Sequence, residues 1–299
     1  MAGTAAHTSK RAESRPASHV PNSRAVALRA NSLFGMVPRF RRLVWAHYKK
    51  YGRHDLPWRE NHDPYRILVS EIMLQQTQVE RVIPFYAEFT RRFPIAKKLA
   101  AAPLSEVLKS WQGLGYNRRA KMLHVAAKKL SSRKINTASE LETLPGVGPY
   151  TARAVAAFAF NQDDVFVETN IRTAVIHHFF PKKKNVSDAD IEKILMQALP
   201  KGKAREWYSA LMDYGAHLKR SGISYNARSR NYTKQSKFRG SLREVRGVIL
   251  RELAKGSRTE ASLVHLLGTN RASQVQQALR DLSAEGLIQK RGKVFTLPR

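Results

Sequence analysis

The sequence predicts an all-α body at residues 33–218 and a smaller C-terminal module at residues 241–299, in which three helices are closed by a β-hairpin. Two observations predict the body: apolar residues recur there at helical spacing, and short turns rich in Pro or Gly separate the helical segments. A third observation is that strand-like segments occur only near the C-terminus. The hydrophobic fraction of 42% over 299 residues is enough for one large core or two smaller ones.

The first helix of the body is predicted at residues 37–51, with Pro38 in its first turn and Gly52 at its end. No convincing strand pattern interrupts the segments that follow, so the body is expected to be all-α. These segments lie at residues 64–76, 78–93, 103–112, 118–131, 138–144, 149–160, 170–179, 188–198 and 204–217.

The C-terminal module is expected to have helices at residues 241–253, 259–267 and 272–285, followed by two strands at 287–290 and 294–297. Three helices closed by a hairpin are typical of a winged helix-turn-helix module, which binds DNA. Small helical bundles can imitate this order. The polar side chains of its predicted recognition helix are Arg271, Gln274, Gln276, Gln277 and Arg280.

The charge of the chain points to a polyanionic partner. Lys and Arg number 53 against 23 Asp and Glu, a formal net charge of +30, and nucleic acid is the commonest partner of so basic a protein. No apolar run approaches the length of a membrane span, so we expect a soluble protein and, in addition, a monomer. The absence of cysteine excludes disulfides, a thiolate metal site and a cysteine nucleophile, and we expect no cofactor and no metal.

Two segments are expected to lie outside the folded units. Residues 1–32 are rich in Ala, Ser and Arg and are predicted to form a disordered basic tail. Their composition also fits an organelle transit peptide, although the lack of a clear amphipathic face favours a tail that tethers the chain to DNA. Residues 219–240 are basic, polar and poor in aliphatic side chains, which predicts a basic linker.

A glycine-rich hairpin joins the predicted helices at residues 138–144 and 149–160. Glycine lets backbone amides approach a phosphate closely, and the N-terminus of the second helix favours an anion. The two helices and the hairpin would form a helix-hairpin-helix, which grips the DNA backbone without reading sequence. An ordinary glycine turn is the alternative. The residues expected at the DNA backbone are Gly146, Val147, Gly148 and Thr151.

Two carboxylates, Glu71 and Glu168, stand in apolar or amide-rich surroundings. On a helix, Glu71 would share a face with Gln75 and Gln78, so that a charged group and two amides point toward the same neighbour. A solvated helix face explains many such acids. The apolar residues around Glu71 nevertheless make its full exposure unexpected.

Four segments resemble, in the same order, the adenine DNA glycosylases of the MutY type. They are Leu-Pro-Trp-Arg at 56–59, Ser-Glu-Ile-Met-Leu-Gln-Gln-Thr-Gln-Val at 70–79, Trp-Gln-Gly-Leu-Gly-Tyr at 111–116 and Leu-Pro-Gly-Val-Gly at 144–148. The resemblance runs from about residue 56 to residue 217 and implies the helix-hairpin-helix DNA glycosylase fold with two helical subdomains. The paired glutamines favour this branch over the endonuclease III relatives.

The resemblance implies a role for three residues of the reaction site. Glu71 matches the family's general acid, which protonates adenine at N7 so that the base can leave. Glu168 falls where the family has an aspartate that stabilises the oxocarbenium-like sugar through a covalent intermediate, a logic similar to that of glycoside hydrolysis. Asn170 matches an asparagine that orients the site. An acid near a helix start is the plainer explanation of Glu168.

The resemblance also implies a group of base-binding and wedge residues. Gln76 and Tyr116 match side chains that enter the base stack when the target nucleotide is flipped out, although Tyr116 could also be a core aromatic. Tyr150 stands where bifunctional relatives have a lysine that cleaves the strand, which implies base removal alone. The whole binding group is Trp58, Arg59, Leu74, Gln75, Gln76 and Tyr116.

Three features depart from the family pattern. Glu168 is one methylene longer than the usual aspartate, and a misplacement on the order of 1 Å can cost about a hundredfold in rate. Many relatives have a larger C-terminal domain that recognises 8-oxoguanine opposite the adenine, where this chain has the smaller module. The sequence therefore does not decide which base lies opposite the adenine. At the four positions where the family has the cysteines that bind an iron-sulfur cluster, this chain has Lys219, Asn226, Ser229 and Gln235, none of which can hold such a cluster.

The sequence therefore predicts a monofunctional DNA glycosylase of base excision repair that acts on double-stranded DNA with a mispaired or damaged base. Adenine opposite 8-oxoguanine or guanine is the leading substrate. The alternatives are a thymine or uracil mismatch glycosylase and a DNA-binding homologue that has lost catalysis. In a bacterium the protein would be cytoplasmic and associated with the nucleoid, while the N-terminal tail is also compatible with an organelle.

Overall fold

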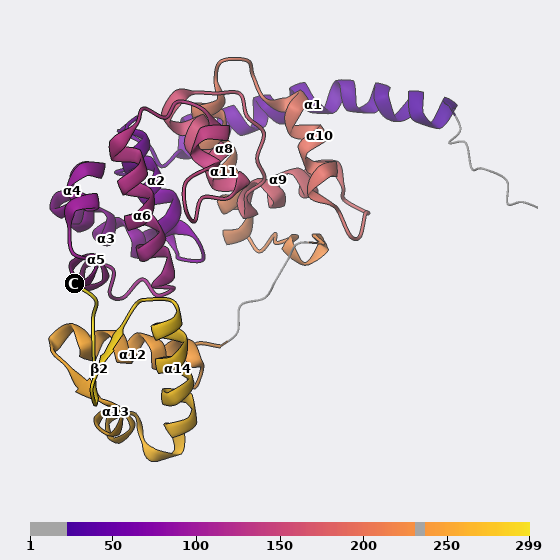
Figure 1. The fold of residues 1–299 in the computed structure, drawn as a ribbon. Helices are drawn as coiled ribbons and strands as arrows, with labels where there is room; N and C mark the ends of the chain where they lie inside the picture. The colour runs from indigo at the N-terminus through magenta and orange to yellow at the C-terminus, as the bar shows by residue number, and fades with distance from the viewer. Residues whose placement is uncertain (1–22, 231–236) are drawn as a thin grey trace, which may run out of the picture.

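The computed structural model describes residues 23–230 and 237–299, and this part of the chain forms a helical body with a smaller module beneath it (Figure 1). The all-α prediction for the body is confirmed. Its helices are α1 (Ser23–Tyr51), α2 (Pro64–Leu74), α3 (Val79–Arg92), α4 (Ala96–Ala101), α5 (Leu104–Ser110), α6 (Arg118–Ser132), α7 (Ala138–Glu142), α8 (Pro149–Phe160), α9 (Thr169–Phe179), α10 (Asp188–Ala198) and α11 (Ala204–Arg220).

Local sequence sets where several of these helices begin. Asp63 caps α2 by accepting a hydrogen bond from the Tyr65 amide at 2.9 Å, and Pro64 occupies the first helical position. Thr137 and Ser187 start α7 and α10 with capping boxes, in which the side chain of the third helical residue bonds back to the capping residue. The starts of these helices therefore follow from sequence alone.

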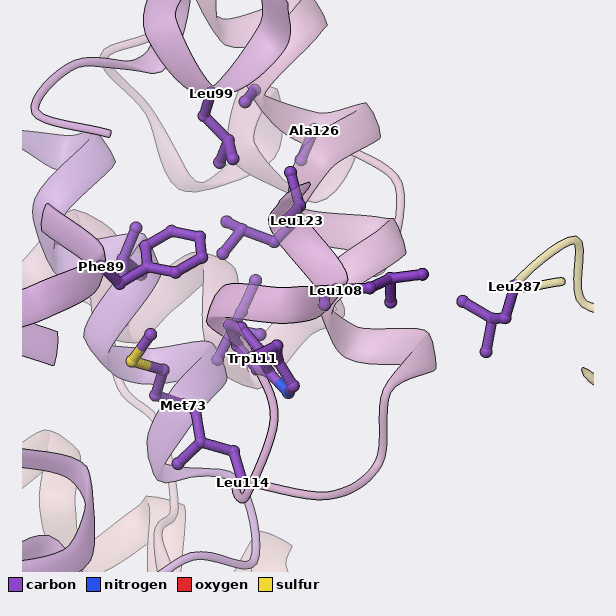
Figure 2. Packing of buried hydrophobic residues seen from close by; sticks show 14 of the residues in the cluster. Met73, Phe89, Leu99, Leu108, Trp111, Leu114, Leu123, Ala126 and Leu287 are labelled. Atoms are coloured by element: carbon purple, nitrogen blue, oxygen red, sulfur yellow. The ribbon is translucent and has the colours of Figure 1, made fainter. Parts of the chain in front are cut away.

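Two apolar clusters hold the body together. The first lies among α2 to α8 and is built around fully buried side chains such as Phe89, Trp111 and Leu123 (Figure 2). The second joins α1 to α9, α10 and α11 through residues such as Val44 and Trp207. Helix α2 of the first cluster packs against α8, and α9 of the second packs against α11. The two cores together fix the relative positions of α2, α8 and α9.

The contact between α9 and α11 depends on Gly215. A Cβ atom added at this position would lie 2.0 Å from the carbonyl oxygen of Asn170, which is backbone and cannot turn aside. Real side chains do not approach so closely, so only glycine allows this spacing of the two helices. The position of Asn170 is therefore set by a glycine in a distant part of the sequence.

The predicted boundaries of the tail and of two helices were wrong. Helix α1 begins at Ser23 rather than at residue 37, so the predicted disordered tail of residues 1–32 is helical in its last ten positions, where good helix formers such as Ala and Leu recur. Residues 1–22 lie outside the described residues. Helix α2 ends at Leu74 rather than at residue 76, because Gln76 has a φ of 56°. Gln78 consequently caps α3 and does not share a face with Glu71.

The predicted linker at residues 219–240 is packed against the body over its first half. Helix α11 continues to Arg220, and the Val186 amide donates to the carbonyl of Arg228 at 2.8 Å. Tyr225 stacks on His177 with ring centroids 5.7 Å apart. Backbone pairing and ring stacking give these residues partners that composition does not show. Residues 231–236 lie outside the described part of the chain.

The three helices and the hairpin predicted for the C-terminal module are present, with one additional strand. A two-residue strand, β1, was too short to predict, and the strands form an antiparallel sheet in the order β1–β3–β2. The elements are α12 (Leu242–Lys255), β1 (Arg258–Thr259), α13 (Glu260–Leu267), α14 (Ala272–Ala284), β2 (Gln289–Arg291) and β3 (Val294–Thr296).

The module docks on α5 and α6 of the body. Leu287 is buried and points toward Leu108 of α5 (Figure 2), and both belong to the first apolar cluster. Beside this contact, Nζ of Lys121 in α6 donates to the carbonyl of Glu285 at 2.5 Å. The two units thus share one core. Within the described ranges, no helix is both long and apolar enough to cross a membrane.

Candidate active site

A cavity of about 460 Å³ opens between α2, α8, α9 and α11. A cavity of this size is typical of a small-molecule or base-binding site. It brings together nine of the residues predicted from sequence, which come from separate parts of the chain. These residues are Trp58, Arg59, Glu71, Leu74, Gln75, Gln76, Tyr150, Glu168 and Asn170.

Glu71 lies in α2 with only 6% of its surface exposed, as the apolar residues around it predict. Burial raises the pKa of its carboxyl to about 7, and the nearby charge of Glu168 acts in the same direction. The hydroxyl of Tyr150 donates to Oε2 of Glu71 at 3.1 Å and partly opposes this rise. Burial also raises the pKa of Tyr150 well above its ordinary value, so the phenol keeps its proton. Glu71 is thus able to hold a proton near neutral pH and to release it.

Glu168 is the N-cap of α9, and its longer side chain folds back onto the start of its own helix. Its Oε2 accepts from the amides of Asn170 at 2.6 Å and Ile171 at 3.4 Å, while Oε1 accepts from Nδ2 of Asn170 at 3.2 Å. On balance burial raises the pKa of this carboxyl, and the charge of Lys219 and the two amides oppose that rise. The extra methylene is therefore accommodated, and the helix start favours the ionised form.

The two carboxyls consequently have different surroundings. Glu71 faces a neutral phenol, whereas Glu168 faces backbone amides and the ammonium group of Lys219. Environments of this kind separate an acid from an anion in enzymes that use two carboxyl groups. The geometry therefore suits Glu71 as a proton donor and Glu168 as a negative charge beside it.

The walls of the cavity are held by a buried ion pair. Both guanidinium nitrogens of Arg59 donate to Asp213, at 2.7 and 3.0 Å, and Asp213 is 2% exposed. Arg53 also binds Asp213 through its amide and side chain. Trp58 packs edge-on against Tyr86 with ring centroids 5.5 Å apart. Arg59 thus lines the cavity, but its positive charge is neutralised by the carboxylate of Asp213.

Gln76 and Tyr116 are brought together although 40 positions separate them in the sequence. Both have left-handed backbones, with φ of 56° and 49°, a conformation that costs energy for residues other than glycine. With Gly146 of the hairpin they line a second cavity of about 440 Å³, open to the surface. Strained residues at such a place are typical of a functional surface.

The hairpin between α7 and α8 has the predicted form. Gly146 has a φ of 78°, and a Cβ atom there would lie 2.5 Å from Cβ of Met122, so both its conformation and its packing require glycine. A Cβ atom at Gly148 would meet open space instead. Val147 and Thr151, which were expected at the DNA backbone, are only 5% and 3% exposed, so their side chains are not available to a phosphate. The Thr151 hydroxyl accepts from Nε2 of Gln75 at 3.3 Å.

Arg119 is a residue of this region that was not predicted from the sequence. Its Nη1 donates to the carbonyls of Ile72, Met73 and Gln75 at 2.6 to 3.1 Å, and its Nη2 to those of Leu114 and Gly115 at 3.3 and 3.2 Å. Burial lowers the pKa of this guanidinium to about 10. The one signal in the sequence was an arginine three residues after Tyr116 at a helix start. Arg119 ties the end of α2 to the loop of Tyr116 and so fixes both left-handed residues.

We expect Arg119→Lys to lower the free energy of unfolding by about 2–3 kcal/mol, because an ammonium group cannot reach all these carbonyls and some would stay buried without a donor. Denaturant unfolding measures this loss. The control is Arg118→Lys, which changes an exposed arginine beside it. Equal stability of the two variants would contradict the role assigned to Arg119.

Comparison with known proteins identifies the relatives of this chain. Residues 69–201 match the family model for HhH-GPD superfamily base excision DNA repair proteins. Among curated relatives, an adenine DNA glycosylase of Mycolicibacterium smegmatis is 35% identical over 268 residues, which are 80% of this chain and 89% of that protein. One of Mycobacterium tuberculosis is 34% identical over 82% of this chain and 88% of its own length. One of Buchnera aphidicola is 37% identical, and the match spans half of that protein's length.

Among solved structures, a thermostable thymine-DNA glycosylase has a TM-score of 0.53 and 26% identity, and the match covers 61% of this chain and 87% of the other. An endonuclease III in a non-covalent DNA complex has a TM-score of 0.50 and 20% identity over 59% of this chain and 84% of the other, a likeness of fold.

The helical fold, the hairpin and the matched segment define the class, a base excision DNA repair protein of the HhH-GPD superfamily. Within this superfamily, the match to the adenine DNA glycosylase of Mycolicibacterium smegmatis over most of both chains identifies the family. The chain belongs to the adenine DNA glycosylase family.

Proposed function

We propose that this protein is a monofunctional glycosylase that removes mispaired adenine from double-stranded DNA. The observation that carries the proposal is the buried pair of carboxyls. Glu71 has a pKa of about 7 and accepts a hydrogen bond from Tyr150, while Glu168 accepts hydrogen bonds from backbone amides at the start of α9. The family of the chain supplies adenine as the base.

The first step is extrusion of the target nucleotide, because a base within the stack cannot reach Glu71. The hairpin at residues 146–148 would bind the backbone phosphates through its amides, and Gln76 and Tyr116 would fill the gap left in the stack. The flipped base would enter the cavity beside Trp58.

The chemical step follows from the two carboxyl groups. Glu71 gives its proton to adenine N7, and the electron pair of the C1′–N9 bond leaves with the base. The ionised Glu168 stabilises the positive charge that develops on the sugar, and Asn170 holds this carboxylate in place. A water oxygen then bonds to C1′, and its proton returns to Glu71. The products are free adenine and an abasic site.

The decisive experiment measures base release from duplexes with adenine, thymine or uracil opposite guanine or 8-oxoguanine. We expect adenine to be released, and release opposite both partners or only one would define the opposite base. The solved thymine-DNA glycosylase with 26% identity makes thymine the second candidate, and uracil, which differs from thymine by one methyl group, is tested with it. Release of these bases alone would replace adenine in the proposal, and no release from any duplex would favour a DNA-binding homologue without catalysis.

We expect no strand cleavage beyond base removal, because Tyr150 offers no amine for a Schiff base at the position facing Glu71. Borohydride treatment during turnover should trap no protein–DNA adduct, and alkali should be needed to cut the abasic strand. The substitution Tyr150→Lys provides a control in which an amine is introduced at this place. A trapped complex with the unsubstituted protein would contradict the monofunctional proposal.

The pH dependence of the rate should follow the protonation of Glu71. A general acid acts in its protonated form, so kcat should fall as pH rises through about 7, the pKa of this carboxyl. Single-turnover rates from about two pH units below this pKa to about two units above it measure the fall, with DNA binding followed in parallel. A rate that rises through this range would show that Glu71 acts first as a base.

The division of labour along the chain is also part of the proposal. Residues 33–218 would form the catalytic unit, and residues 241–299, whose helices and sheet have the order of a winged helix, would add DNA contacts. Gln276, Gln277 and Arg280 are exposed on α14 and suit such contacts, although each bonds to a neighbouring side chain. Arg271 is half-buried and is bound to Glu244 and Gln274. We propose that the protein acts as a monomer on the DNA of the cytoplasm or nucleoid.

A further inference from the structure

Tyr116, the proposed wedge residue, is contacted by an arginine of the C-terminal module. The guanidinium carbon of Arg243 in α12 lies 5.2 Å from the centre of the Tyr116 ring, and Nη1 of Arg243 donates to the Tyr116 hydroxyl. Arg119 of the body lies 5.4 Å from the same ring centre. Two guanidinium groups from different units of the protein therefore hold one aromatic ring.

The place of Arg243 is fixed by the docking of its module. Val245 and Ile249, on the same helix, are fully buried within the apolar cluster that the module shares with the body. Lys121 of the body adds its bond to the carbonyl of Glu285 in the module. Because these contacts immobilise α12, Arg243 reaches Tyr116 from a rigid support and not from a free surface chain.

The energetic argument starts from the backbone of Tyr116. Its φ of 49° is unfavourable for a tyrosine, so the ring keeps its position only if other contacts offset the strain. A guanidinium over an aromatic ring and a hydrogen bond to the phenol each favour the held position. Without Arg243, the ring would lose this cation and this hydrogen bond and would keep the guanidinium of Arg119.

We propose that Arg243 is a positioning residue that holds Tyr116 ready to enter the base stack, so that the C-terminal module assists extrusion of the nucleotide. The inference rests on the wedge role of Tyr116 in the proposed function. It gives the module a task beyond binding DNA, and it places that task before the chemical step carried out by Glu71 and Glu168.

The test compares Arg243→Ala with Arg246→Ala. Arg246 lies one helical turn away and binds Glu285 at 2.6 Å within the module, so its substitution reports on module integrity alone. At saturating enzyme, we expect Arg243→Ala to release adenine about tenfold more slowly in a single turnover, while Arg246→Ala stays near the unsubstituted rate. Arg243→Lys, which restores a cation, should recover part of the loss. Thermal unfolding confirms that all three proteins are folded.

A second readout does not depend on base release. In a Glu71→Gln background, 2-aminopurine placed at the target position becomes brighter when it leaves the stack, so its fluorescence reports extrusion directly. We expect Arg243→Ala to slow or reduce this signal. Extrusion without release of any base by the unsubstituted protein would refute the proposed chemistry and leave the inference about Arg243 standing.

A double substitution distinguishes an Arg243 that positions Tyr116 from an Arg243 that contacts DNA. If Arg243 acts through Tyr116, then Arg243→Ala should have no further effect on the rate once Tyr116→Ala is present, because coupled residues are not additive. The same loss in both backgrounds, with a shallower salt dependence of binding, would mean that Arg243 contacts a phosphate and would overturn the inference. An unchanged rate and an unchanged fluorescence signal for Arg243→Ala would overturn it as well.

Discussion

Glu71→Gln is expected to slow base release by about a thousandfold, because the amide keeps the shape of the carboxyl and has no proton to give to the base. Glu71 is 6% exposed and bonds to Tyr150, whose hydroxyl can donate equally well to an amide oxygen. The fold and the affinity for duplex DNA should therefore be preserved. Single-turnover base release and equilibrium DNA binding are the two measurements.

The matched control is Glu60→Gln, which removes an exposed acid close to the same cavity and should leave the rate unchanged. A parallel loss of DNA binding in Glu71→Gln would show instead that the carboxyl is structural.

Glu71→Gln should also raise the stability of the protein at alkaline pH. The pKa of Glu71 is raised by burial to about 7, so its contribution to stability is complete below the unfolded pKa and is lost as pH rises through about 7. At higher pH the folded protein holds a buried charge at a cost of roughly 3 kcal/mol, which glutamine avoids. The difference in melting temperature between the two proteins should therefore be largest at and above about pH 7 and should disappear as pH falls toward 4.5, the ordinary pKa of a glutamate.

Glu168→Gln is expected to slow base release by at least about a hundredfold, since it removes the negative charge that faces the developing charge on the sugar. The glutamine oxygen can still accept from the amides of Asn170 and Ile171, so α9 should keep its cap and the protein its stability. The measurement is again single-turnover release, with unfolding as the check on the fold.

Glu168→Asp tests whether the longer side chain is fitted to this site. The amide contacts of Glu168 place its carboxylate by folding the side chain back onto the start of α9, and aspartate would shift the group by roughly 1.5 Å. We expect about a hundredfold slower release than with Glu168. A faster rate with aspartate would show that this site is not adapted to glutamate.

Several features of the site followed from the sequence because they depend on local chemistry. The hairpin was recognisable from Gly146, which its left-handed backbone requires, and from Gly148 and Pro149 at the start of α8, where proline suits the first helical position. The burial of Glu71 followed from its apolar neighbours on the same helix. The pairing of Glu71 with Tyr150 could be expected only from the family resemblance, since 79 positions separate them.

Other features could not be predicted because they depend on contacts between distant segments. The length of α2 was overestimated because the periodicity continues to Gln76, while Arg119 binds the carbonyls at the end of the helix and stabilises a left-handed turn there. Residues 219–230 were assigned to a linker on their composition, but pairing with Val186 and stacking on His177 attach them to the body. The basic and polar composition of this segment does not show which distant residues it contacts.

The sequence by itself determined the helical class, the hairpin, the lack of thiolate ligands and the presence of two carboxylates in apolar surroundings, because these depend on residue type and short spacing. Which carboxylate is the acid and which the anion was implied only by the family resemblance. The tertiary structure decided how these groups act. It raised the pKa of Glu71 by burial, held Glu168 at the start of α9, and placed Arg243 of the C-terminal module on Tyr116. Desolvation and contacts between distant segments exist only in the packed chain, so no local pattern could reveal them.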